Sequence, residues 1–184
     1  IVFILHWYLS LFSQTFFLHR YAAHSMFRMN AFWEKFFYFF TWITQGSSYL
    51  SPYAYGILHR LHHAFTDTEN DPHSPSYTKG LFPLMWKTKQ IYGDINSDKF
   101  PVDDKFMKNL PMWRSFDRFV SSFGIRIAWG VIYFLFYLAF ATQWWMWLLF
   151  PITCLMGPVH GAIINYFAHK YGYRNFEMED TSKN

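Results

Sequence analysis

The chain has 184 residues, of which 52% are apolar and 24% aromatic, whereas only 15% are charged. An average soluble domain has about 25% charged residues, so this composition excludes an ordinary cytosolic globular protein. The net charge of +4 is modest and the basic residues are scattered among aromatic ones. This pattern favours a membrane-facing surface and argues against a nucleic-acid partner.

Long apolar stretches organise the sequence. A bilayer core of about 30 Å needs about 20 mostly apolar residues in a helix. Three stretches qualify by length, namely residues 1–18, 121–141 and 143–168, the last of which is interrupted by Pro151, Gly157 and Pro158. Residues 31–50 form a fourth apolar stretch, but charged and polar side chains interrupt it. We therefore expect an all-α, polytopic membrane helical bundle.

The polar residues 51–120 separate these stretches and give an orientation. Nine of the 16 Lys and Arg residues lie between residues 59 and 118, and the turn 141–143 has none. Because positive residues near span ends stay in the cytoplasm, the polar region is expected to form a cytosolic, histidine-rich cap. Residues 1–184 are interpreted as one domain that is incomplete at both ends, since the chain opens inside an apolar stretch without Met or a cleavage site.

Histidines gather where the apolar stretches end. His59, His62 and His63 in HRLHH are spaced so that a helix can point their imidazoles at one or two adjacent points. His19 and His24 in HRYAAH are five apart, a poor spacing for an α-helix, so we expect the helix to end or loosen between them. Such a cluster predicts a metal site, and imidazole nitrogens suit Zn, Cu, Fe or Ni.

Further residues near the membrane boundary could complete this site. Asn165 and His169 are four apart and share a helix face, and Asp67 and Asp71 could hold the second ring nitrogens of the histidines. The histidines of HRYAAH can meet those of HRLHH and His169 only if residues 31–50 do not cross the bilayer fully. A full crossing would place HRYAAH on the opposite side of the membrane from the other histidines. We therefore expect that segment to lie in the interface or to turn back.

Three motifs resemble those of one known family. HRYAAH resembles the first histidine box, HxxxxH, of the integral-membrane fatty acid desaturases, and HRLHH resembles the second, HxxHH. The continuation TDTENDPH is similar to that of Δ9-type acyl desaturases, and NYFAHKYGYRNFE resembles the segment with an Asn and a His before YGYR. The resemblance covers nearly the whole chain. A further HxxHH box is expected beyond Asn184.

This resemblance implies a centre of two non-haem iron ions. The metal ligands it implies are His19, His24, His59, His62, His63 and His169, with Asn165 acting through water. Asp67 and Asp71 would support ligand rings, and His73 of the DPH element is not counted among the ligands. The family architecture is a four-span bundle under a cytosolic cap, with an in-plane helix between the first two boxes.

The implied activity is O₂-dependent insertion of a cis double bond into a long acyl chain, carried as acyl-CoA or acyl-lipid, in lipid biosynthesis. No catalytic residue beyond the metal ligands is expected. Electrons would come from a cytochrome b-type protein or a ferredoxin with its reductase. Two alternatives stay open: a membrane fatty acid or alkane hydroxylase with similar boxes, and a haem-binding membrane electron carrier.

Overall fold

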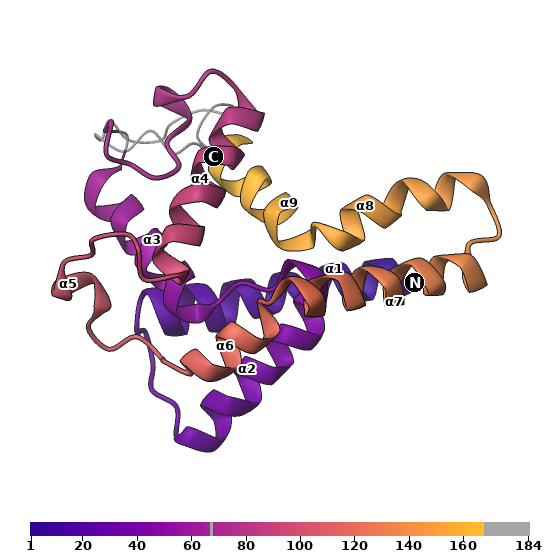
Figure 1. Cartoon of the computed structure of the whole chain (residues 1–184), viewed down its shortest axis with the longest axis horizontal. Helices are drawn as coiled ribbons and strands as arrows, with labels where there is room; N and C mark the ends of the chain where they lie inside the picture. The colour runs from indigo at the N-terminus through magenta and orange to yellow at the C-terminus, as the bar shows by residue number, and fades with distance from the viewer. Residues whose placement is uncertain (67, 168–184) are drawn as a thin grey trace.

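The computed structural model describes residues 1–66 and 68–167, and every regular element in that part is helical (Figure 1). In chain order the elements are α1 (Val2–Phe12), the π-helix η1 (Ser13–Ala23), α2 (Ala31–Gln45), η2 (Gly46–Ser48), α3 (Pro52–Phe65), η3 (Pro75–Tyr77), α4 (Leu81–Asn96), α5 (Asp104–Met107), α6 (Arg114–Val120), α7 (Phe123–Phe140), η4 (Trp144–Leu148), α8 (Leu149–Cys154), α9 (Met156–Ala162) and the π-helix η5 (Ile163–Phe167). The all-α prediction is confirmed.

The predicted apolar spans correspond only partly to the helices. Among the described residues, α7 is the one helix that is long and apolar enough to cross a membrane, with a mean hydropathy of 1.7. A second candidate is the pair Trp144–Cys154 and Met156–Phe167, which is bent by 81°. Residues 1–18, the first predicted span, fall within α1 and η1 and do not meet the same test.

The bend lies within the interrupted apolar stretch of residues 143–168. Pro158 has no N–H to donate to the carbonyl of Cys154, four residues earlier, so a straight α-helix cannot form there. The Ser47 hydroxyl donates to that carbonyl instead at 2.7 Å, and the Gly157 N–H donates to the Ser48 hydroxyl at 3.0 Å. The bend is therefore docked against η2.

The segment 31–50 does not form a full-length spanning helix. α2 has 15 residues, fewer than the about 20 that a span requires. It ends at Gly46, whose φ of +51° suits glycine, and a Cβ there would lie 1.8 Å from the Tyr133 hydroxyl oxygen. The chain then turns into η2 and returns as α3. This geometry supports the prediction that the segment turns back.

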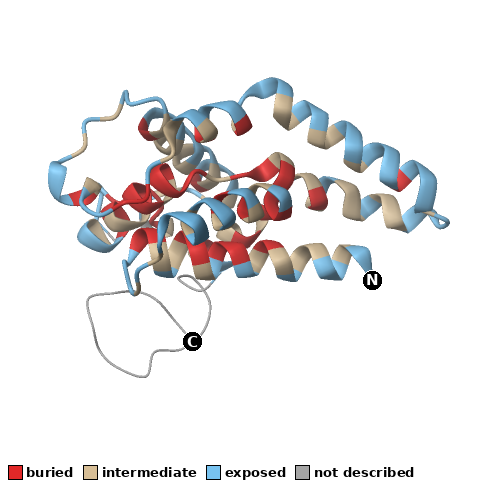
Figure 2. Ribbon diagram, turned by 90° about the horizontal axis from the view of Figure 1, so that it is seen from below, coloured by how far each residue is buried: buried red, intermediate tan, exposed pale blue. Residues whose placement is uncertain are grey.

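Burial is concentrated around α3 and η1 (Figure 2). One face of α3 packs against η1 and another against α4 and the α5 region, and the free end of the α7–α8 hairpin is mostly exposed. The start of α3 is anchored by the buried carboxylate of Asp117, which accepts hydrogen bonds from the Tyr49 hydroxyl at 2.7 Å and the Ser51 hydroxyl at 2.9 Å. Ser51 also caps α3 by accepting from the Ala54 N–H.

Candidate metal centre

The first histidine pair lies on η1. The His24 N–H donates to the His19 carbonyl at 3.0 Å, the i to i+5 bond that defines a π-helix. In an α-helix of 3.6 residues per turn, positions five apart diverge by about 140° around the axis. The wider π turn brings both rings to one side, and their centroids are 4.5 Å apart. The helix therefore loosens as predicted, and it ends at Ala23, directly before His24.

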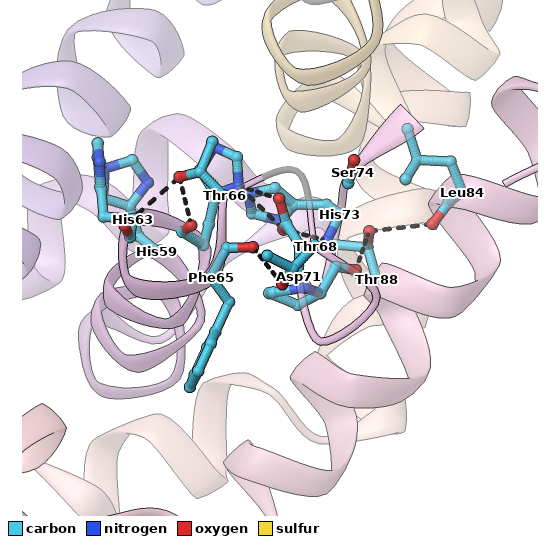
Figure 3. Close-up of polar contacts among 12 residues, drawn as sticks. His59, His63, Phe65, Thr66, Thr68, Asp71, His73, Ser74, Leu84 and Thr88 are labelled. Atoms are coloured by element: carbon cyan, nitrogen blue, oxygen red, sulfur yellow. Dashed lines mark hydrogen bonds and ion pairs between the residues drawn. The ribbon is translucent and has the colours of Figure 1, made fainter. Parts of the chain in front are cut away.

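Two histidines of α3 meet this pair. His59 and His63 are four apart on α3, and their Nε2 atoms lie 2.9 Å from each other (Figure 3). The Nε2 atom of His24 lies 3.0 Å from that of His59 and 3.2 Å from that of His19. The structure thus brings four predicted ligands, His19, His24, His59 and His63, to one point between η1 and α3. We call these residues the four-histidine cluster.

The electrostatics of this cluster favour neutral imidazoles at His19 and His59. Burial lowers the pKa of His59 far below its ordinary value, and the neighbouring His19 and His63 lower it further. The pKa of His19 is lowered chiefly by burial and then by His24. The ring of Tyr55 stacks on His59 at 5.7 Å, with 7° between the planes. A group of neutral ring nitrogens is the form in which histidine binds borderline metals.

His62 belongs to a second group beside the four-histidine cluster, and its ring centroid lies 5.6 Å from that of His63. Its Nδ1 lies 2.9 and 3.0 Å from the two carboxylate oxygens of Asp71, and its ring centroid is 4.3 Å from that of His73. All three residues are buried, and their ligand atoms lie within 4.8 Å of one another. A carboxylate at Nδ1 directs the other nitrogen, Nε2, toward a possible metal. His73 was not predicted as part of the site, although the DPH sequence was a visible signal.

The remaining predicted residues have different outcomes. Asn165 is half-buried on the π-helix η5, and no hydrogen bond within the described part of the chain joins it to a histidine. Asp67 and His169 lie outside the described residues. His160, which is not a predicted ligand, packs edge-on to Trp7 with the ring centroids 4.5 Å apart.

Comparisons with known proteins decide the family. The family model described as "Fatty acid desaturase" matches residues 1–184. The chain belongs to the fatty acid desaturase family. Within the family, it is 30% identical over 182 residues to "Delta-9 desaturase-like 5 protein" of Arabidopsis thaliana, which covers 94% of this chain and 54% of that relative.

Other desaturase relatives have a similar overlap. The chain is 30% identical to "Delta-9 acyl-lipid desaturase 2" of Arabidopsis thaliana over 90% of its own length and 51% of the relative's. It is 24% identical to "Acyl-CoA 5-desaturase AL21" of Anemone leveillei over 94% of its length and 51% of the relative's. The chain thus spans about half the length of the curated relatives it matches. No solved structure gives a significant match.

Proposed function

We propose that this chain forms the part of an integral-membrane acyl desaturase that holds a His-ligated centre of two non-haem iron ions. The observation that carries the proposal is the convergence of four imidazole Nε2 atoms from η1 and α3, although His19 and His59 are 40 positions apart in the sequence. Neutral, partly buried imidazoles are a donor set that fits iron without adding charge to the site. The family match supports iron over the other borderline metals.

The proposed ligands are the four-histidine cluster together with His62, His169 and, through water, Asn165. In the full-length protein, further ligands would come from the rest of the chain, since the relatives are about twice as long. Asp71 would fix the ring of His62 through Nδ1, and Asp67 is proposed to support a ligand ring in the same way. Tyr55 would hold the plane of His59 by stacking.

The chemistry proposed is the conversion of two adjacent methylenes to a cis double bond. With O₂, two electrons and two protons, the reaction yields the alkene and two molecules of water. The iron centre supplies the oxidising power that protein side chains lack. In this proposal the histidines hold the metal with neutral ring nitrogens. Their neighbours fix the planes of the imidazole rings, and burial keeps water from part of the four-histidine cluster.

We further propose that the protein is a multi-pass membrane protein with its histidines on the cytoplasmic side, and that it takes part in lipid biosynthesis. The apolar helix α7 and the bent pair Trp144–Cys154 and Met156–Phe167 support membrane insertion. The substrate is a long acyl chain, carried as an acyl-lipid or an acyl-CoA, because relatives are named for each. Electrons come from a cytochrome b-type protein or a ferredoxin with its reductase.

The product tests this proposal directly. Full-length protein is expressed in cells, and the fatty acid methyl esters of their membranes are analysed by mass spectrometry. New monounsaturated esters are expected for the wild type and none for His59→Gln, whereas His6→Gln, a histidine of α1 beside Tyr133, keeps the activity. Hydroxylated esters would favour the hydroxylase alternative, and a haem Soret band without iron-dependent product would favour the electron carrier.

A further inference from the structure

The side chain of Arg60 is surrounded by acceptors from two segments of the chain, residues 22–25 and residues 106–108. A guanidinium has five N–H groups. The five acceptors within hydrogen-bond distance are the carbonyls of Ala22 (3.1 Å), Ala23 (2.7 Å), Phe106 (3.0 Å) and Lys108 (2.7 Å) and the hydroxyl of Ser25 (3.2 Å). Every donor of Arg60 is therefore matched by an acceptor of the protein itself.

Three of these acceptors lie where η1 ends. The last carbonyls of a helix have no partner within the helix. The N–H groups of Ser25 and Met26 bond further back, to the carbonyls of Tyr21 and Arg20, so no backbone donor in the described part of the chain reaches the carbonyls of Ala22 and Ala23. Ser25 then takes a left-handed conformation with φ of +52°, and the chain leaves the helix. Arg60 satisfies this end of η1 and places a positive charge at the negative end of the helix dipole.

The position of Arg60 in the sequence links the two histidine motifs. Arg60 directly follows His59 on α3, and Ala23 directly precedes His24. α3 approaches η1 closely at Gly56, where an added Cβ would lie 3.6 Å from the Ala22 carbonyl oxygen and 2.5 Å from a Leu110 methyl carbon. One side chain therefore joins the residue before His24 to the residue after His59, across an interface that is already tightly packed.

This arrangement does not suit a substrate-binding role for Arg60. A phosphate or carboxylate would have to displace the carbonyls of Ala22 and Ala23, which have no other donor among the described residues, and would leave these buried acceptors unpaired at a cost in free energy. Within the described residues, no carboxylate pairs with Arg60 either. Its bonds reach only the main chain and one hydroxyl.

We propose that Arg60 is a positioning residue that fixes His24 relative to His59 by capping η1. This inference rests on the proposed function only in assuming that these histidines bind metal. Lysine cannot replace the planar guanidinium of Arg60, because an ammonium group has its three donors at one point. It cannot reach both the end of η1 and residues 106–108. Arg60→Lys is therefore expected to free the end of η1 while keeping the charge.

Arg126 provides a matched control. It donates to the main-chain carbonyls of Ser47, Tyr49 and Ser121, and none of these bonds involves the segments around His24 or His59. Arg126→Lys thus removes a comparable set of hydrogen bonds to main-chain carbonyls elsewhere in the fold. Both variants are made in the full-length protein, purified in detergent and compared with the wild type by circular dichroism.

Two measurements follow. Hydrogen exchange of the metal-free proteins is expected to be about tenfold faster at residues 22–26 in Arg60→Lys and unchanged there in Arg126→Lys. Cobalt(II) added to the same proteins is expected to bind about 10- to 100-fold more weakly in Arg60→Lys, with altered d–d absorption bands, and normally in Arg126→Lys. If Arg60→Lys does not fold, Ser25→Ala, which removes one of the five acceptors, is expected to accelerate exchange in the same segment by a smaller factor.

The outcomes separate this inference from the proposed function. Unchanged exchange at residues 22–26 in both Arg60→Lys and Ser25→Ala, with wild-type cobalt bands, would overturn the positioning role even if the protein desaturates acyl chains. Faster exchange confined to that segment supports the positioning role even if the wild type yields no unsaturated product, in which case the proposed function fails alone.

Discussion

Replacing Asp71 by Ala is expected to damage both the fold and the proposed metal site. The carboxylate is fully buried and accepts hydrogen bonds from His62 Nδ1 and from the His73 N–H at 3.0 Å. Alanine leaves two buried donors without this acceptor, and each such loss costs about 1–3 kcal/mol, so the expected destabilisation is about 2–6 kcal/mol. Metal affinity is expected to fall about 10- to 100-fold as well, because the ring of His62 loses its orientation.

The assay is thermal unfolding of the full-length protein in detergent, followed by circular dichroism, together with cobalt(II) titration of the folded state. Asp103→Ala is the control, since that carboxylate is 74% exposed and its ion pair with Lys105 is a surface pair worth little. Asp71→Asn should lie between the two, because it keeps one acceptor oxygen. Equal melting temperatures for Asp71→Ala and Asp103→Ala, with equal cobalt affinity, would refute the reasoning.

Two further predictions concern residues that support the helices around the site, namely Gly46 and Asp117. Gly46→Ala is expected to lower the free energy of unfolding by about 1–3 kcal/mol or more, because alanine disfavours the left-handed φ and its methyl group would clash with Tyr133. Gly93→Ala is the control: its added methyl group meets no atom within 4 Å and is expected to stabilise α4 slightly. The melting temperatures of the two variants check this. Burial raises the pKa of the Asp117 carboxyl above its ordinary value of 3.8. The protonated carboxyl therefore gives its full contribution to the free energy of unfolding below pH 3.8, and this contribution is lost as the pH rises through the higher pKa of the folded state. Asp117→Asn should remove this fall, and melting curves between about pH 4 and pH 7 that keep the wild-type slope would contradict the assignment.

The sequence predicted the parts of the site that follow from local spacing. The four-residue interval between His59 and His63 puts both rings on one face of α3, as helix geometry requires. The interruptions within residues 31–50 indicated a short helix, and Gly46 and the serines after it end α2 early; that this segment does not cross the bilayer stays a prediction. The helical class followed from the long apolar stretches.

Other features depend on contacts that spacing does not reveal. The five-residue interval between His19 and His24 suggested a weakened helix, but the π-helix also needs a partner for its final carbonyls, and that partner is Arg60, 36 positions after His24. His62 shares helix spacing with its neighbours, yet it turns to Asp71 because the DPH segment folds back along α3. The prolines predicted a break in the last apolar stretch, whereas its docking depends on Ser47, which is 107 positions away from Cys154.

The central claim is that the histidines of η1 and α3 jointly bind iron, and quantification of iron in purified full-length protein tests it most directly. The wild type is expected to hold two iron ions per chain, with Mössbauer parameters of non-haem, nitrogen-ligated iron, and both His24→Gln and His59→Gln are expected to lose iron while retaining helical content. Full iron occupancy in both variants, or a wild type that binds no iron under reducing, metal-replete conditions, would contradict the account.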